Sequence, residues 1–255
     1  MADVFWCSVS RQKARLQRHY HDTYAFGFID HGLSRYDCGT HQFQTDPQTL
    51  FLINPGDVHT GFPASSEPIS YTTFHVDPAY VRALTGHSHD RPFGQYLCTQ
   101  PGLGAALREA AREREGELAR LAIENMLALV LPAMLGDGRL RDSAALHLSG
   151  LRRACELLLS DLRQTVSLAA LAQAANLERA YFARQFRRFY GLPPHQMLKQ
   201  ARVVAARRQL FAGTMGAEVA QDVGFFDQSH MIRCWKDVYA VPPSQMKKVN
   251  IVQST

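Results

Sequence analysis

The sequence has few cysteines and no pattern that would pair them. Five cysteines occur in 255 residues, they stand far apart, and none belongs to a C-x-x-C pair. A secreted domain held together by disulfides shows an even set at short spacings. We therefore expect buried or free thiols in a reducing compartment. The five are Cys7, Cys38, Cys98, Cys155 and Cys234.

The sequence also lacks a signal peptide and a long uncharged apolar run. Its N-terminus has neither the basic start nor the apolar core of a signal peptide. The most apolar stretch, residues 118–135, contains Arg120 and Glu124 and meets Pro132, so its uncharged part is too short to span a bilayer. We expect a cytoplasmic protein without a membrane partner.

Negative charge is scarce in the C-terminal part of the chain. Residues 151–255 hold 15 Lys and Arg against 7 Asp and Glu, whereas residues 1–150 hold 13 against 16. The pI of about 9.0 therefore comes from the second part. A basic part joined to a mildly acidic one is typical of a nucleic-acid-binding module attached to a different domain. A solvated basic face is the alternative explanation.

Short apolar runs separated by turn residues fill the chain from about residue 20 to residue 76. They lie at residues 24–29, 34–38, 50–53 and 69–76. Strands of this length and spacing predict an antiparallel sandwich or a small barrel. Farther on, residues 103–115 and 117–131 are rich in Ala, Leu, Glu and Arg and predict two helices. The helix at 117–131 is apolar around most of its circumference, so we expect it to pack against the barrel, a partner subunit or both.

A polar segment with two glycines, residues 136–143, divides the chain. We predict an N-terminal domain of residues 1–135, a linker of residues 136–147 and a C-terminal domain of residues 148–255. The C-terminal domain is predicted to be all-helical, because its apolar residues recur at helical spacing. Ser167 is a helix cap, and a long helix is expected from Pro194 to about Leu210.

One segment of the C-terminal domain is repeated forty-nine residues later. Residues 184–197 and 233–246 share an Arg, an aromatic residue, a cation, a Tyr, a Pro-Pro pair and a Gln-Met pair in the same register. A repeat at a fixed period indicates a duplicated supersecondary unit, and two copies are too few for a solenoid. We therefore predict two small helical units that each present cations.

Each copy is predicted to be a helix-turn-helix, whose second helix enters the major groove of DNA. Asn176 and Gly224 supply the turns, because both tolerate the left-handed conformation that ends a helix. The residues expected to face the core of each copy are Phe182, Phe186 and Phe189 in the first and Met231, Trp235 and Val238 in the second. The outward residues are Ala180, Ala183, Arg184 and Arg187 in the first and Gln228, Ser229, Ile232, Arg233 and Lys236 in the second.

The outward residues predict two kinds of DNA contact. An Arg in the groove can bond guanine O6 and N7 bidentately, which gives about 1–3 kcal/mol of discrimination, and Gln228 can do the same for adenine. The cations farther along are expected to neutralise phosphates, which adds affinity but no sequence information. These are Arg187, Arg188 and Lys236. A single Arg is often only a solvated charge, but matched positions in two copies favour a function.

These segments resemble the DNA-binding domain of the AraC/XylS transcription regulators. The resemblance covers about residues 151–248 and rests on the motifs at 167–172, 181–186, 191–194, 219–220, 224–225, 233–236 and 242–243. It implies two helix-turn-helix units, joined by a long helix, that contact successive major-groove segments on one face of promoter DNA. By this resemblance the residues that face bases are Ala180, Ala183, Arg184, Gln228, Ser229, Ile232 and Arg233.

Four positions depart from the pattern of this family. They are Glu178, in place of a capping Ser, Gly216, in place of an apolar residue, Ala240, in place of Gly, and Met246, in place of Tyr. The first copy also has two small residues among its outward positions. We therefore expect the second copy to dominate sequence specificity.

The N-terminal histidines resemble those of the cupin-like domain that such regulators often carry for ligand binding and dimerisation. The resemblance rests on the pair His19 and His21, on Gly32 and on the segment from Asn54 to His59. It predicts an all-β cupin-like barrel with flanking helices, in which His side chains hydrogen-bond a small molecule. The candidate ligand-binding residues are His19, His21, Tyr24, Arg35, His59, Tyr71, Thr73 and His75. For Tyr24, Phe26 and Phe28, which share a face, the favoured interpretation is that they only fill the barrel.

Three hypotheses follow from the sequence. The favoured one is a dimeric transcription regulator, with no enzymatic activity and no cofactor, whose partners are double-stranded promoter DNA, a small-molecule effector and RNA polymerase. The second is a metal-dependent cupin enzyme that uses His19, His21 and His59, although the acidic ligand expected shortly after His21 is absent. The third is a DNA-binding protein whose barrel serves only for dimerisation.

Overall fold

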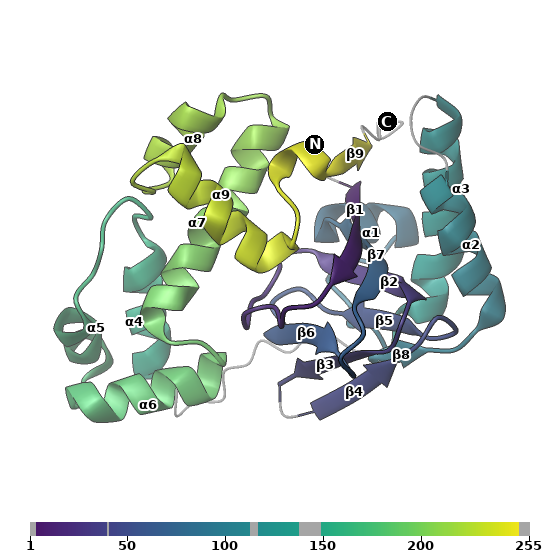
Figure 1. The fold of residues 1–255 in the computed structure, drawn as a ribbon. Helices are drawn as coiled ribbons and strands as arrows, with labels where there is room; N and C mark the ends of the chain where they lie inside the picture. Colours follow the sequence, from purple (N-terminus) through teal and green to yellow (C-terminus); the bar gives the residue numbers. More distant parts are fainter. Residues whose placement is uncertain (1–3, 40, 113–116, 138–148, 250–255) are drawn as a thin grey trace. The chain divides into compact units, whose positions relative to one another are not determined.

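The chain folds into two compact units. The computed structural model, drawn in Figure 1, describes residues 4–39, 41–112, 117–137 and 149–249. The β unit comprises Met1–Leu16, His21–Leu140 and Gln245–Thr255, and the helical unit comprises Gln17–Tyr20 and Arg141–Ser244. Most of the predicted linker, from residue 138 on, lies outside the described residues.

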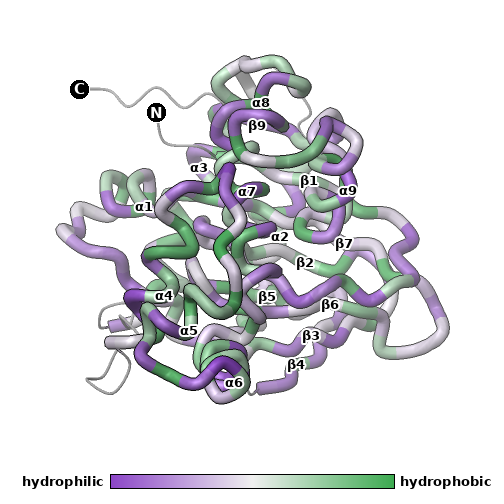
Figure 2. Tube along the Cα trace, turned by 90° about the vertical axis from the view of Figure 1, so that its left-hand side faces the viewer, coloured by the Kyte–Doolittle hydropathy of each residue, from purple (hydrophilic) through white to green (hydrophobic). Residues whose placement is uncertain are grey.

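Two antiparallel sheets form the frame of the β unit. The larger has the order β8-β5-β2-β7-β1-β9, and the smaller has the order β4-β3-β6. The strands of the larger sheet are β1 (Val4–Gln12), β2 (Tyr24–His31), β5 (Leu50–Ile53), β7 (Ile69–Val76), β8 (Leu97–Cys98) and β9 (Lys247–Val249). Those of the smaller are β3 (Ser34–Cys38), β4 (His41–Thr45) and β6 (His59–Pro63). The hydrophilic colours in Figure 2 run along β3 and β4, and β4 is largely exposed.

The two sheets face each other, and side chains from both meet between them. The ring of Tyr36, on β3, lies 6.5 Å from that of Phe51, on β5. Phe51 in turn lies 6.5 Å from Tyr71 on β7. The strands pair as two sheets and not as one closed barrel, and otherwise the predicted β-rich fold class is confirmed.

All four strands predicted from apolar runs are present, but β1 was not predicted. It pairs with β7 from Val4 opposite Val76 to Gln12 opposite Ile69. Its first four residues are all buried, because it lies inside the sheet between β7 and β9. A strand that is buried on both faces shows no alternation of apolar and polar residues, which removes the usual signal.

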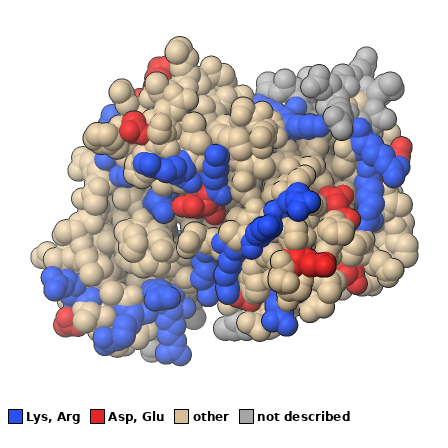
Figure 3. Space-filling view, in the orientation of Figure 1, with Lys and Arg blue, Asp and Glu red and all other residues tan. Residues whose placement is uncertain are grey.

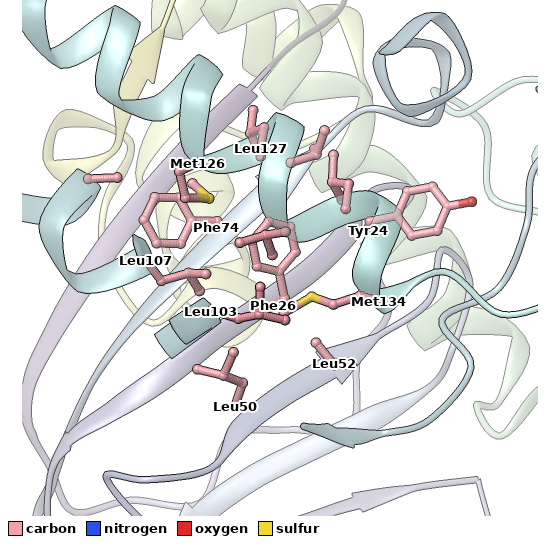
Figure 4. Packing of buried hydrophobic residues seen from close by; sticks show 14 of the residues in the cluster. Tyr24, Phe26, Leu50, Leu52, Phe74, Leu103, Leu107, Met126, Leu127 and Met134 are labelled. Atoms are coloured by element: carbon pink, nitrogen blue, oxygen red, sulfur yellow. The ribbon is translucent and has the colours of Figure 1, made fainter. Parts of the chain in front are cut away.

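Helices cover the other face of the larger sheet. These are α1 (Pro78–Thr85), α2 (Pro101–Arg112) and α3 (Glu117–Met134), the last extending three residues beyond the predicted end. Phe26 and Phe74 pack here with Leu107 of α2 and Leu127 of α3 (Figure 4). No helix among the described residues is long and apolar enough to cross a membrane.

The face of β2 that carries Tyr24, Phe26 and Phe28 belongs to this helix-covered core. The sequence pattern instead predicts these aromatic residues inside the barrel. The alternation of a strand groups residues on one face but does not tell which face meets which layer. The structure has the three on the side of α2 and α3, away from the smaller sheet.

The helical unit consists of two helix-turn-helix copies joined by a long helix (Figure 1), which confirms the predicted class. The first copy is α5 and α6, the second is α8 and α9, and α7 connects them. The helices are α4 (Ser149–Leu159), α5 (Leu168–Ala175), α6 (Arg179–Tyr190), α7 (Pro194–Phe211), α8 (Gly216–Asp222) and α9 (Gln228–Tyr239), and a 3₁₀ turn follows at Pro243–Gln245. As predicted, Phe182, Phe186, Met231, Trp235 and Val238 are buried.

Both turns have the same hydrogen bonds but different lengths. In each, a left-handed residue, Asn176 or Gly224, donates its N–H to the carbonyl three residues back, and the next N–H bonds the carbonyl five back. One residue separates Asn176 from the capping Glu178, whereas two separate Gly224 from the capping Asp227. The second turn is thus longer by one residue, and Phe226 in it is 90% exposed.

The repeat offers a matched pair for testing helix ends. Gly191 ends α6 with φ of 73°, and Ala240, forty-nine residues later, ends α9 with φ of 62°. The left-handed conformation costs an L-residue roughly 1 kcal/mol, and Gly avoids this cost.

We expect Ala240→Gly to raise the free energy of unfolding by up to about 1 kcal/mol and Gly191→Ala to lower it by a similar amount. Urea denaturation of both variants measures the two changes. A less stable Ala240→Gly protein would contradict the assignment of strain at Ala240.

Candidate functional sites

The N-terminus of α6 is capped by a carboxylate. Glu178 accepts hydrogen bonds from the backbone N–H groups of Ala180 and Tyr181, both at 2.9 Å. These bonds hold the pKa of Glu178 below its usual value. A negative charge here also suits the helix dipole. The replacement of a capping Ser by Glu therefore keeps the cap intact.

The outward face of α6 carries most of the predicted residues in exposed positions. Ala180, Arg184, Arg187 and Arg188 are exposed, and Ala183 is half-buried. Figure 3 shows Lys and Arg side chains gathered over this helix.

Tyr181 is an exposed aromatic residue of α6 for which the sequence predicted no role. It is 45% exposed, and the guanidinium carbon of Arg184 lies 6.0 Å from the centre of its ring. Tyr181 and Arg184 are three residues apart, so they are neighbours on the helix surface. Their spacing was the signal that could have identified the pair.

The outward face of α9 is equally open. Gln228, Ser229, Arg233 and Lys236 are exposed, and Ile232 is half-buried. Asp227 caps the helix and accepts a bond of 2.6 Å from the N–H of His230.

Gln228 lies against the start of α8. A Cβ atom on Gly216 would stand 2.7 Å from its Nε2 atom. Gly216, which departs from the family pattern, has no side chain, and this leaves the space that the Gln228 amide occupies.

Three imidazoles lie together in the β unit. The ring centre of His21 is 5.0 Å from that of His59 and 4.6 Å from that of His75. We call His21, His59 and His75 the histidine cluster. All three are buried, as is Phe5, whose ring stacks parallel to His75 at 4.6 Å.

Hydrogen bonds orient two rings of the histidine cluster. The Nδ1 atom of His59 lies 2.8 Å from the carbonyl oxygen of Asp57, so this nitrogen carries the hydrogen and donates it. In the neutral ring Nε2 is then an acceptor. His75 has its Nδ1 atom 3.1 Å from Oγ1 of Thr23.

Tyr71 and Thr73 share the face of β7 that carries His75, as predicted from the alternation along this strand. Tyr71 is half-buried, and burial raises the pKa of its hydroxyl far above the usual value. Tyr71 and Thr73 each place a hydroxyl group on the face of β7 that carries His75.

Two of the other predicted ligand residues, Tyr24 and Arg35, lie away from the histidine cluster. Tyr24 is in the helix-covered core, where its hydroxyl donates to the carbonyl oxygen of Arg91 at 2.7 Å. Arg35 is exposed on β3, on the face opposite to Tyr36. His19 belongs to the helical unit, and its Nδ1 atom lies 2.7 Å from the carbonyl oxygen of Gln17.

β1 adds two residues to the site that were not predicted from the sequence. Phe5 and Cys7 lie on the same face of β1, opposite His75 and Thr73 of β7. Burial raises the pKa of the Cys7 thiol to about 12, so Cys7 is a neutral, weakly polar side chain. Both were missed because β1 itself was missed.

From Leu121 to Ala133 the exposed residues of α3 are apolar except for Asn125. Ile123, Leu127 and Val130 on the inner face are fully buried, whereas Leu121 and Leu129 are 43% and 56% exposed. Ala128, Pro132 and Ala133 are exposed beside them. We call these exposed residues, Leu121, Ala128, Leu129, Pro132 and Ala133, the α3 stripe.

Two family models match consecutive parts of the chain. The AraC-like ligand binding domain matches residues 7–131, and a helix-turn-helix domain matches residues 171–248. The first match contains the histidine cluster and most of α3, and the second contains both exposed recognition helices.

Among curated proteins, the HTH-type transcriptional regulator YbfI of Bacillus subtilis (strain 168) is 25% identical over 224 residues, which are 85% of this chain and 82% of that protein. Among solved structures, ToxT of Vibrio cholerae O395 has a TM-score of 0.52 at 14% identity and covers 96% of this chain and 95% of its own. Wild-type ToxT of Vibrio cholerae strain SCE256 with a bound unsaturated fatty acid has a TM-score of 0.52 at 15% identity, over 96% of this chain and 93% of its own. Since a ligand-binding domain precedes a helix-turn-helix domain, and since each matches its own family model, the chain belongs to the AraC-type transcriptional regulators.

Proposed function

We propose that the protein binds promoter DNA in a sequence-specific manner through α6 and α9 of residues 148–255, and that residues 1–135 bind an effector and dimerise. The observation that carries the proposal is the matched pair Arg184 and Arg233. They stand at the same position of the two copies, and both are exposed on the outward face of a recognition helix. An exposed Arg at this position can bond guanine, and two such helices contact two groove segments.

The two recognition helices differ in chemistry. α9 offers Gln228, Ser229 and Arg233, which can each hydrogen-bond a base edge, and Ile232 can contact a thymine methyl group. α6 offers small Ala180 and Ala183 beside Arg184 and then the cations Arg187 and Arg188. The second copy is therefore proposed to supply most of the sequence preference and the first copy most of the phosphate contacts.

Substitutions of two neighbouring cations on α9 are expected to have different effects, one on sequence specificity and the other on overall affinity. Arg233→Ala is expected to lose about 1–3 kcal/mol of discrimination at one base pair, because a bidentate contact is removed. Lys236→Ala is expected to weaken all duplexes alike and to reduce the salt slope by about 0.9, the contribution of one phosphate contact.

Titration of selected and random duplexes at several salt concentrations distinguishes the two effects. The assignment fails if Arg233→Ala keeps the full preference for the selected duplex. It also fails if Lys236→Ala changes the preferred sequence.

The effector is proposed to bind between the two sheets, beside the histidine cluster, Tyr71 and Thr73. Imidazole and hydroxyl groups are hydrogen-bond partners suited to a sugar, an amine or an acid. ToxT, which has the same fold, was solved with an unsaturated fatty acid, which supports a small molecule as effector. The family match favours this role over that of a metal-dependent cupin enzyme.

Thermal denaturation with a monosaccharide, a primary amine, a short carboxylic acid and an unsaturated fatty acid tests the effector site. A bound ligand at about 100 times its Kd stabilises the folded state by about 2.7 kcal/mol. We expect one class to raise the Tm of the wild type and not that of His75→Ala.

Tyr24→Phe is the matched control, because it removes a buried polar group from the opposite face of the sheet. It should keep the ligand response. An equal response in His75→Ala would place the ligand elsewhere, and no response to any class would favour a domain that only dimerises.

A second copy of the chain is proposed to cover the α3 stripe. The stripe runs along α3 at helical spacing from Leu121 to Ala133, which is the pattern of a helix that packs against a partner helix. Arg120 and Glu124, 3.9 Å apart, lie next to Leu121 and supply a charged border.

Sedimentation equilibrium tests this dimer. Leu129→Glu should convert the dimer to a monomer, because two unpaired carboxylates would be buried in the interface. Leu33→Glu changes a leucine of the same unit that is 43% exposed outside the stripe, and it should leave the dimer intact. A dimeric Leu129→Glu protein would exclude α3 as the interface.

The remaining parts of the proposal follow from promoter binding. A regulator bound at a promoter acts on RNA polymerase, and it acts in the cytoplasm, where the DNA is. It works as a regulator and not as an enzyme.

A further inference from the structure

Arg202, on α7, joins the two helix-turn-helix copies. Its Nε atom donates to the carbonyl oxygen of Leu162 at 2.7 Å, and its Nη2 atom donates to that of Gln164 at 3.4 Å. Both acceptors lie in the loop between α4 and α5, which precedes the first copy. The planar fork of an Arg can bond two carbonyl oxygens at once, which a Lys ammonium does less well.

The turn of the second copy meets the same loop. A Cβ atom on Gly224 would stand 2.5 Å from the carbonyl oxygen of Leu162 and 2.7 Å from Cα of Arg163. It would also stand 3.1 Å from Nε of Arg202. Loop, guanidinium and turn are therefore in direct contact, and only Gly fits at this point of the turn.

The loop itself is held in shape. The backbone N–H of Arg163 donates to the side chain of Asp161 at 2.9 Å, and the N–H of Gln164 donates to the carbonyl oxygen of Asp161 at 3.2 Å. These bonds form a tight turn that presents the Leu162 carbonyl to Arg202. Arg202 thus lies between two preformed turns, the loop that precedes the first copy and the turn of the second copy.

Beside this joint the copies are not in continuous contact. A cleft of about 350 Å³ is lined by Leu168 and Leu171 of the first copy and by Phe225 and His230 at the second, and Arg202 is part of its wall. Since an open cleft supplies no packing between the copies, their relative placement depends on the shared helix α7 and on the joint at Arg202.

We propose that Arg202 is a positioning residue that fixes the distance and angle between α6 and α9, and thereby the spacing between the two DNA segments that the protein contacts. The inference rests on the proposed function. Two linked binding modules gain affinity only when the geometry lets both engage at once. A rigid joint therefore favours one spacing and disfavours the others.

The test uses the full-length protein and a duplex that it enriches from a random library. Footprinting locates the two contacted segments, and one base pair is then inserted or deleted between them, which rotates one segment by about 35° relative to the other. The wild type should lose about tenfold or more in affinity for the shifted duplexes.

Arg202→Met keeps the unbranched stem and removes the donors. Its affinity for the enriched duplex should fall about tenfold, while its affinity for the shifted duplexes should fall less than about twofold. The ratio between spacings then approaches one. Arg208→Met removes an exposed cation from the same helix, and it should weaken all duplexes alike and keep the ratio.

A folded Arg202→Met protein that keeps the wild-type ratio overturns the inference. If this variant does not melt cooperatively, Arg202→Lys, which keeps the charge and the stem, is measured in the same way, and an unchanged ratio again overturns it. Failure of the proposed function looks different, because the wild type would then enrich no duplex at all.

Discussion

Each helix-turn-helix copy is too small to bury its own apolar stripe, and the structure of the helical unit depends on this constraint. Phe182 and Phe186 of α6 are buried in one cluster with Met197 and Leu198 of α7. Fully burying a side chain of this size contributes about 1.5–3 kcal/mol, so the shared helix is needed for stability. Because the apolar sides of α6 and α9 must face inward, their polar sides are left exposed. The surface available to DNA is a consequence of how the core is formed.

A similar constraint organises the β unit. The central strands β2 and β7 are buried on both faces, with helices on one side and the smaller sheet on the other. The helix-covered face is filled by aromatic and aliphatic side chains, among them Phe26 and Phe74. The face toward the smaller sheet instead carries His75. His21 lies beside His75, and His59 lies beside His21. Polar groups that are buried need hydrogen-bond partners, so the polar face is the one where a ligand can replace a protein partner.

The sequence predicted those parts whose signal is local. The alternation in residues 69–76 correctly placed Tyr71, Thr73 and His75 on one face, and the helical spacing correctly separated Trp235 from Arg233. The choice of layer for Tyr24 was wrong, since parity cannot identify the layer that a face meets.

What sequence patterns missed depends on contacts that are distant in the chain. β1 was missed because burial on both faces removes alternation. Arg202 was not singled out either, since its acceptors in the loop around Leu162 lie forty residues away. On a helical pattern it is one more cation, and only the folded unit shows that it bonds backbone carbonyl groups.

The same holds for Gly224: its need for a left-handed conformation could be inferred locally, but the absence of space for a Cβ atom could not. In the first copy the equivalent residue, Asn176, is exposed, so a side chain is tolerated there. The turn with Gly224 lies against the loop around Leu162, whereas the turn with Asn176 has room for a side chain. The two copies therefore differ in packing as well as in the residues that they present to DNA.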